Sequence, residues 1–399
     1  MSFQSLPGFR DFFPETMAIR RHIEAAWHAS AHAAGFEEIE GPPLESLDLL
    51  KAKSGDAIVD QLYAFTDKGG REVALRPELT PTVARMIADR ASSLSKPTKW
   101  YGTPQLFRYE RKQRGRLREH IQWNVDIFGA DHVASDAELL AVALDALQRL
   151  GLTSKDIYVR VSDRRVAEAK LQELGVEDMQ ATLTLIDKEM LGTEKAAAVL
   201  PAPTITALQE WLREPFEQDG DFGDFTRACD DFGIADFLEP DKNIVRGLAY
   251  YTGIVWEIFD RKRTLRAVAG GGRYDTLIER MGGPAMPALG FGMGDVVLGE
   301  LLKDLDLLPA TPARIDALVV ALGDDMTGPA RQVVARLRAR GMAAEASYSP
   351  MKLGKAFKAA ERAGASEIYI VGSDEWSRGE VQVKNLASGE QRTESLGAG

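Results

Sequence analysis

The stretch from Arg118 to Ile127 alternates between polar and apolar side chains, and this alternation strongly limits how the chain can fold. Successive side chains of a β-strand point to opposite faces of the sheet. One face of such a strand is therefore apolar and suited to a core, and the other face is polar. The apolar positions are Ile121, Trp123, Val125 and Ile127, and the polar positions are Arg118, His120, Gln122, Asn124 and Asp126.

The turn that leads into this strand is strongly basic, although the whole chain has a formal net charge of −11. Between Arg108 and His120, five arginines and one lysine stand against two glutamates. Two interpretations are open from the pattern alone. The polar face can be a solvated surface whose charges block edge-to-edge pairing. Alternatively, the predominance of arginine indicates an anion site, because guanidinium groups offer planar, bidentate donors that match phosphate.

Length and pattern together predict an α+β fold in more than one domain. A chain of 399 residues is too long for a single compact core. Before residue 160, strands joined by tight turns alternate with helices, which is typical of an antiparallel sheet with helices packed on it. We expect helices at 16–34, 80–91 and 134–150, a hairpin around the DKGG turn at 67–70, and two strands within 98–129.

The rest of the chain falls into further segments. Residues 161–240 are acidic and helical in pattern, and strand patterning returns at Tyr250–Phe259 and Arg266–Ala269. We therefore expect a first domain formed by 1–160 and 241–307, with 161–240 as an insertion. A linker at 308–313 precedes 314–399, where strands alternate with helices of ten or more residues. That alternation predicts a small, mostly parallel α/β domain.

Composition and charge exclude several classes of protein. No run of eighteen apolar residues is present, and the N-terminus lacks the apolar core of a signal peptide. The single Cys229 allows no internal disulfide and fits a cytoplasmic protein. Net negative charge argues against a protein that coats nucleic acid non-specifically, but it leaves room for an RNA bound through a local patch. We expect neither a membrane nor DNA as a partner.

Two further motifs suggest a ligand site. Arg246, Tyr250 and Tyr251 stand just before Ile254–Phe259, a run apolar enough to be a buried strand. They can form a structural salt bridge with core tyrosines, or they can bind a ligand. Glycines at alternate positions clear one face of a strand, so that a flat ligand can lie on the backbone. These are Gly290, Gly292 and Gly294, whose spacing and context differ from the dinucleotide-binding fingerprint.

The motifs occur in a fixed order along the chain: LRPELT at 75–80, FRYERKQRGRLREHIQWNVDIFG at 107–129, RGLAYYTG at 246–253 and GGGRYD at 270–275. In this order they resemble the class II aminoacyl-tRNA synthetases, and the histidyl-tRNA synthetases in particular. GFRDFFPE at 8–15 resembles the N-terminal signature of that family, GPPLE at 41–45 its dimer-forming first motif, and the tail its anticodon-binding domain. The resemblance implies a class II antiparallel-sheet catalytic domain, a helical insertion, an anticodon-binding α/β domain at 314–399, and a homodimer.

The resemblance also implies a reaction and the residues that carry it. ATP and L-histidine would form a histidyl-adenylate, from which histidine passes to its tRNA. Arg108 and Arg246 would contact the α-phosphate from opposite sides. On the ATP side the resemblance further implies Glu110 toward adenine or the metal, Arg116 toward the outer phosphates that Mg²⁺ bridges, His120 and Gly292. The histidine pocket is implied at Glu78, Thr80, Gln122, Asp126, Tyr250 and Tyr251, and no protein residue is identified as a metal ligand.

The sequence departs from the class II pattern at two positions on the nucleotide side. Val297 stands where the third motif usually carries an arginine, and His120 stands where an aromatic residue stacks on adenine. We therefore expect another basic residue to meet the γ-phosphate, and its identity does not follow from the sequence. The motif REH-x-QWN-x-DI resembles the corresponding motif in an organellar or plant-type branch of the family.

The alternative function is that of a non-catalytic relative, the regulatory subunit of ATP phosphoribosyltransferase, in which the histidine pocket would serve as a feedback sensor. A sensor has no need of the anticodon-type domain or of the pair Arg108 and Arg246. The sequence contains the domain and both arginines. Residues 311–399 carry twelve basic and eleven acidic side chains, so the negative charge lies in the rest of the chain. A tail of this kind suits docking to RNA, and we expect the catalytic function.

Overall fold

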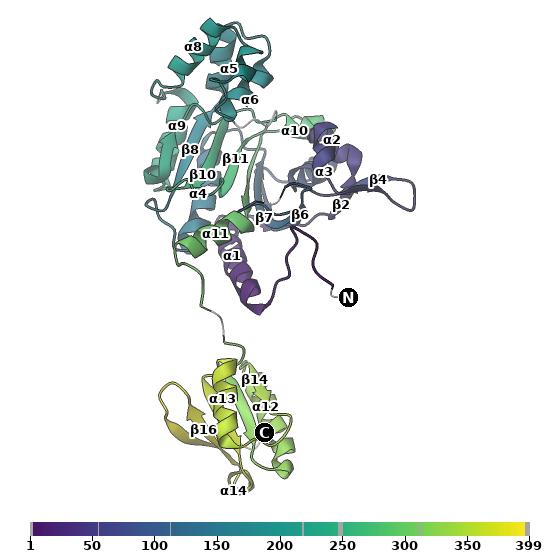
Figure 1. Cartoon of the computed structure of the whole chain (residues 1–399), viewed down its shortest axis with the longest axis vertical. Coiled ribbons are helices and arrows are strands. Elements are labelled where there is room, and N and C mark those ends of the chain that lie inside the picture. Colours follow the sequence, from purple (N-terminus) through teal and green to yellow (C-terminus); the bar gives the residue numbers. More distant parts are fainter. Residues whose placement is uncertain are drawn as a thin grey trace. The chain divides into compact units, whose positions relative to one another are not determined.

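The computed structural model describes residues 3–54, 56–111, 113–217, 219–245, 250–310 and 313–395 (Figure 1). The chain divides into two compact units, Met1–Leu308 and Pro309–Gly399, and each is described by itself. A large, mostly antiparallel sheet in the first unit and a small α/β second unit confirm the predicted α+β fold. None of the described helices is long and apolar enough to cross a membrane.

Nine strands of the described residues form the sheet of the first unit, in the order β1-β5-β7-β12-β11-β10-β8-β9, with β6 paired to β7. Neighbouring strands are antiparallel except for the pairs β1–β5 and β8–β9, which are parallel. The strands are β1 (Glu37–Glu38), β5 (Thr98–Gly102), β6 (Gln105–Phe107), β7 (Glu119–Phe128), β8 (Ile157–Asp163), β9 (Leu238–Pro240), β10 (Ile254–Asp260), β11 (Ala269–Arg273) and β12 (Ala288–Gly294).

The apolar face of β7 packs on the main core, as its alternation predicts. Ile121, Trp123, Val125 and Ile127 are buried beneath helices on this face of the sheet. The ring of Trp123 stacks on that of Trp27 with 6.0 Å between centroids. The helices that contribute to this core are α1 (Pro14–Ala33), α4 (Ala134–Arg149), α9 (Gly220–Asp231) and α11 (Asp295–Asp304).

A second hydrophobic core packs on one end of the other face of the sheet. Side chains of α3 (Thr80–Arg90) and α10 (Leu277–Arg280) pack there with Tyr250, Tyr251 and Tyr274. A small sheet in the order β2-β4-β3 also belongs to the first unit. It consists of β2 (Leu44–Ser46), β3 (Ala64–Thr66) and β4 (Glu72–Leu75), and near it lie α2 (Leu47–Ser54) and the 3-10 turn η1 (Asp56–Gln61).

Fewer residues belong to a separate helical body in the structure than in the predicted insertion, 161–240. Strand β8 continues through Asp163, and helix α9 packs on α4 in the main core, so neither belongs to a separate helical body. The remaining helices share a small core of their own and gather at one end of the unit in Figure 1. They are α5 (Arg164–Glu173), α6 (Met179–Asp187), α7 (Glu194–Ala197) and α8 (Ala202–Trp211), and the turn η2 (Ala235–Phe237) follows α9.

Three strand predictions differ from the structure. Strand β10 begins at Ile254 rather than Tyr250, and the strand predicted at Arg266–Ala269 lies at Ala269–Arg273 instead. The region 98–129 holds three strands, because β5 and β6 are separate. The glycine triplet in β11 has no side-chain alternation to reveal a strand. It is extended because β10 and β12 supply backbone partners on both sides.

The second unit has one five-stranded sheet in the order β14-β13-β15-β16-β17. Strands β14, β13 and β15 are parallel, as predicted, whereas β16 and β17 form an antiparallel hairpin. The sequence of the last strand, QRTES, has no apolar alternation and therefore does not predict a strand. The elements are β13 (Ala317–Ala321), η3 (Asp324–Met326), α12 (Thr327–Ala339), β14 (Ala344–Ala346), α13 (Leu353–Ala363), β15 (Glu367–Val371), α14 (Ser373–Ser377), β16 (Glu380–Asn385) and β17 (Gln391–Ser395).

Candidate active site

The centre of the open sheet face is a floor of glycine backbone. Gly290 of β12 pairs with Asp126 of β7 on one side and with Gly272 of β11 on the other. Two residues further along β12, Gly292 pairs with Asn124 of β7 and with Gly270 of β11. A Cβ atom on Gly290 would collide with the carboxylate of Asp126, and one on Gly292 would collide with the amide of Gln122. The alternating glycines therefore leave room for the two polar side chains of β7 that the sequence assigned to the histidine pocket.

Three tyrosines lie at the covered end of this floor, and the hydroxyl of one of them reaches Asp126. Asp126 is buried and accepts a hydrogen bond from the hydroxyl of Tyr274. The ring of Tyr250 lies 4.6 Å from that of Tyr251 and 6.1 Å from that of Tyr274. Burial, followed by the negative charge of Asp126, raises the pKa of Tyr274 well above its usual value, so this phenol stays protonated and remains a donor.

Four of the six predicted histidine-pocket residues, Gln122, Asp126, Tyr250 and Tyr251, thus lie on or beside this glycine floor. Tyr274 is a further residue of the pocket, which the sequence analysis missed. Tyr274 belongs to the GGGRYD motif, which could have identified it. The remaining two, Glu78 and Thr80, flank Leu79, whose side chain lies in the same apolar cluster as Tyr250 and Tyr251. The segment that leads into α3 at Thr80 is also tied to the basic turn, because Arg108 Nε donates to the carbonyl of Pro77 at 2.9 Å.

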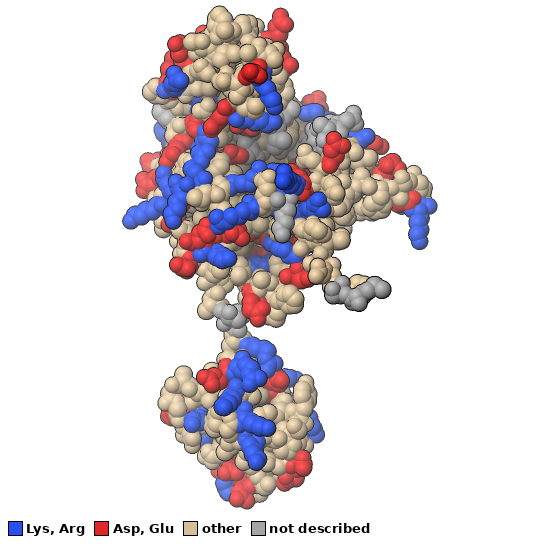
Figure 2. All heavy atoms as spheres, in the orientation of Figure 1, with Lys and Arg blue, Asp and Glu red and all other residues tan. Residues whose placement is uncertain are grey.

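The basic turn lies beside this pocket and joins β6 to β7. The backbone N–H of Arg108 donates to the carbonyl of Arg118 at 2.9 Å, which extends the hairpin beyond the end of β6. Arg116 Nε pairs with Glu110 Oε2 at 2.7 Å. Glu110 therefore orients Arg116 directly. In Figure 2, basic side chains collect on the visible face of the first unit, over the region of β7 and β11.

His120 is a neutral aromatic group at the start of β7. Burial, and then the positive charges of Arg108 and Arg10, lowers its pKa from 6.5 to about 3. An imidazole with this pKa remains uncharged at neutral pH. Its ring is therefore a neutral aromatic surface, which suits the stacking on adenine that the sequence predicts from its position.

The low pKa of His120 predicts a dependence of stability on pH. Below pH 6.5 the unfolded chain binds a proton at this imidazole, whereas the folded chain does not until about pH 3. The free energy of unfolding should therefore fall as the pH falls, by about 2 kcal/mol between pH 7 and pH 5. A His120→Gln variant should lose less over the same interval. Urea unfolding followed by tryptophan fluorescence at both pH values measures the difference, and equal losses would refute the assignment.

Arg10 is a second residue that the sequence analysis did not single out within its motif. Its guanidinium pairs with Asp295 at 2.8 Å and lies 3.6 Å from Glu119. Asp295 in turn accepts the backbone N–H of Ile121 at 2.9 Å. Arg10 therefore joins the N-terminal segment to the start of β7 and to the start of α11. Its signal in the sequence was the GFRDFFPE motif.

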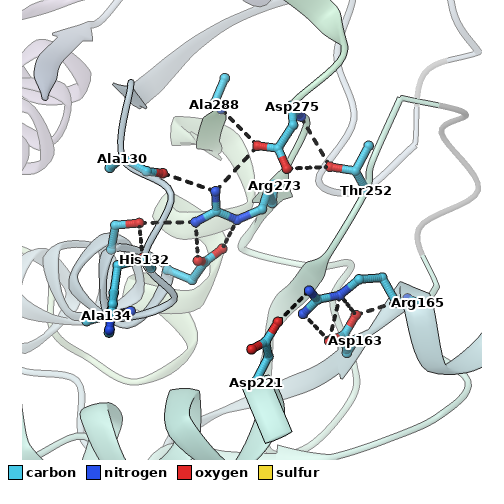
Figure 3. Close-up of polar contacts among 12 residues, drawn as sticks. Ala130, His132, Ala134, Asp163, Arg165, Asp221, Thr252, Arg273, Asp275 and Ala288 are labelled. Carbon is cyan, nitrogen blue, oxygen red and sulfur yellow. Dashed lines mark hydrogen bonds and ion pairs between the residues drawn. The ribbon is translucent and has the colours of Figure 1, made fainter. Parts of the chain in front are cut away.

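A polar network fixes the far end of the glycine strand β11 (Figure 3). Arg273 pairs with Asp136 at 2.5 Å and with Asp275 at 3.4 Å. Asp275 accepts hydrogen bonds from the hydroxyl of Thr252 at 3.2 Å and from the backbone N–H of Ala288 at 3.0 Å. Thr252 directly follows the two tyrosines of the pocket. The arginine and the aspartate of GGGRYD therefore hold the tyrosine loop against β11 and β12.

Arg246, the second predicted catalytic arginine, lies outside the described residues. Its role therefore rests on the motif RGLAYYTG alone. The described neighbours of this segment, Val245 and Tyr250, are both buried.

Comparisons with known proteins identify the family of this chain. The family model described as "Histidyl-tRNA synthetase" matches residues 8–218 and 224–294, and that of an "Anticodon binding domain" matches 316–398. The histidine–tRNA ligase of Opitutus terrae is 40% identical over 420 residues, covering 99% of this chain and 95% of that protein. The chloroplastic/mitochondrial histidine–tRNA ligase of Arabidopsis thaliana is 40% identical over 404 residues, covering 96% of this chain and 83% of that protein.

A solved structure shares the fold along nearly the whole chain. The histidyl-tRNA synthetase from Nostoc sp. PCC 7120 superposes with a TM-score of 0.83 at 22% identity, covering 99% of this chain and 97% of that chain. The family model spans more than half of the chain, and the ligases of Opitutus and Arabidopsis are 40% identical over nearly all of it. The chain belongs to the histidyl-tRNA synthetase family.

Proposed function

We propose that this protein activates L-histidine with ATP and transfers the histidyl group to the terminal adenosine of histidine tRNA. The observation that carries the proposal is the buried Asp126–Tyr274 pair beside a glycine floor and an arginine-rich turn. A carboxylate and phenols suit the amino and imidazole nitrogens of histidine. Guanidinium groups suit the phosphates of ATP. Both substrates of an adenylate-forming reaction would therefore meet on one sheet face.

In the first step, a carboxylate oxygen of histidine attacks the α-phosphorus of ATP, and the bond from that phosphorus to the pyrophosphate oxygen breaks. Arg108, and on the motif evidence Arg246, would stabilise the negative charge that builds up on the α-phosphate. Fixed donors of this kind act strongly in a site that is partly shielded from water. In the second step, a ribose hydroxyl of the tRNA attacks the carbonyl carbon of the adenylate, and AMP leaves.

Specificity for histidine would come from the groups around Asp126. A pocket that pairs the polar groups of histidine leaves those protein groups unsatisfied with any other amino acid. Such a site can reject an analogue by about 10⁴–10⁵-fold without an editing step. Gln122 shares the polar face of β7 with Asp126, and the rings of Tyr250 and Tyr251 pack beside Tyr274, which supports this assignment.

Mg²⁺ would enter the site with ATP. Among the described residues, no three carboxylate, imidazole or thiol side chains lie close enough together to hold a metal ion. Mg²⁺ commonly binds through substrate phosphates with only one or two protein carboxylates. The ion would neutralise phosphate charge, and Glu110 is the carboxylate that the sequence places on this side.

The second unit would bind the anticodon of the tRNA, and two copies of the chain would form a homodimer through the region of the first motif. The match of residues 316–398 to an anticodon-binding family supports the first statement. The GPPLE motif at 41–45 supports the second. A regulatory histidine sensor would require no such tRNA-reading unit.

The proposal is tested with the full chain and with a chain that ends at Leu308. The full chain should catalyse ATP–pyrophosphate exchange that depends on histidine, and it should charge histidine tRNA. The shortened chain, which keeps the catalytic unit, should retain exchange within about threefold but lose at least about tenfold in charging at limiting tRNA, because stacking of even one splayed base contributes about 1–3 kcal/mol. Histidine binding without any exchange by the full chain would favour the sensor function instead.

A further inference from the structure

The third-motif position, which usually carries an arginine in this class, is an apolar packing position in this protein. Val297 is 8% exposed and belongs to the main core. A Cβ atom on Gly115, in the basic turn, would lie 3.2 Å from its Cγ2 atom. The turn therefore rests closely on the side chain of Val297. Any cation for the outer phosphates of ATP must come from another part of the chain.

The strand register places Arg266 at the same end of the sheet. Ala269 of β11 pairs with Met293 of β12, and Gly294, one residue further along β12, pairs with Gln122 of β7. The residues that precede Ala269 therefore lie toward the end of the sheet at which β7 and α11 begin. Arg266 precedes Ala269 by three residues, which span at most about 10 Å, so it lies near this end of β11. This is the end that also carries Val297 and the basic turn.

Arg266 completes a group of guanidinium charges at that end. Burial lowers the pKa of Arg116, the paired Glu110 opposes this, and the positive charges of Arg266 and Arg108 lower it further. Arg266 is thus within electrostatic reach of Arg116. It is exposed, and it forms no ion pair with another residue in the described part of the chain. Several like charges held together in this way repel one another, and a bound polyanion would relieve that repulsion.

We propose that Arg266 binds the β- and γ-phosphates of ATP together with Arg116, and that it replaces the arginine absent from position 297. The inference rests on the proposed function, because it assigns the outer-phosphate end of the same site. During adenylate formation the bond between the α-phosphorus and the pyrophosphate oxygen breaks, and negative charge grows on the departing pyrophosphate. A cation held at that end stabilises the leaving group and so favours the in-line displacement.

Arg266→Ala tests this inference, with Lys262→Ala as the matched control on the same β10–β11 connection. Lys262 is also exposed, so each variant removes one surface charge. Calorimetry of the full chain should show binding of ATP and of inorganic pyrophosphate weakened about tenfold or more in Arg266→Ala, because charge-assisted hydrogen bonds are lost. Binding of AMP, which lacks both outer phosphates, should be unchanged. Histidine-dependent exchange should fall by about 10²-fold, with an unchanged KM for histidine.

Arg266→Lys separates charge from geometry. It should recover part of the affinity for pyrophosphate, because an ammonium group keeps the charge but not the bidentate contact. The inference is wrong if Arg266→Ala binds ATP as Lys262→Ala does, or if AMP and ATP binding weaken equally. Absence of histidine-dependent exchange in the unmodified chain would reject the proposed function instead. In that case, selective loss of ATP and pyrophosphate binding would still establish the phosphate subsite.

Discussion

Replacing Arg108 with alanine should lower the rate of histidine-dependent ATP–pyrophosphate exchange by about 10²–10³-fold, the usual cost of removing one donor to a developing charge. Arg108 Nε donates to the carbonyl of Pro77 at 2.9 Å, which fixes the direction of the guanidinium. Its terminal nitrogens form no ion pair with another described residue and can meet a phosphate. Steady-state exchange at saturating histidine, with ATP varied, measures the loss.

Arg114→Ala is the matched control for Arg108, because it removes an arginine from the same turn. Arg114 is exposed and pairs with Glu300 at 3.1 Å and with Asp304 at 2.7 Å. A surface ion pair of this kind contributes little to stability, so exchange should change by less than about threefold. A similar loss in both variants would show that the turn acts only through its overall charge. Near-normal exchange by Arg108→Ala would reject its catalytic role.

Replacing Asp126 with asparagine should weaken histidine binding by about 10²-fold or more while leaving the affinity for ATP unchanged. The amide oxygen of asparagine can still accept the hydroxyl of Tyr274, so the packing of the pocket is preserved. What is lost is a buried negative charge opposite a protonated group of the substrate, and breaking such a pair costs several kcal/mol. Calorimetric titration with histidine, and separately with ATP, measures the two affinities.

Tyr274→Phe is the control for Asp126, since it removes only the hydroxyl that donates to this carboxylate. It should weaken histidine binding by roughly tenfold, the cost of one hydrogen bond in the pocket. If Asp126→Asn instead weakened ATP binding alone, the assignment of the polar face of β7 to histidine would be wrong.

The local sequence pattern predicted the positions of some site residues in the sheet but not of others. Gln122 and Asp126 follow from the alternation of β7, because side chains two residues apart share a face whatever the rest of the chain does. The glycines of β12 were placed on one face by the same rule. Local alternation could not locate β11, since a run of glycine has no side chains to alternate. The backbones of β10 and β12 define that strand.

The sequence by itself determined the polar and apolar faces of β7, the α+β class and the family, because periodicity and motif wording are local properties of the chain. Only the tertiary structure decided which distant groups meet. Tyr274 reaches Asp126 across 148 residues, Arg10 reaches Asp295 across 285 residues, and Arg266 approaches Arg116 through the register of β11 and β12. The physical reason is that such pairs are set by strand pairing and side-chain packing, whose energies depend on the whole fold rather than on neighbouring residues.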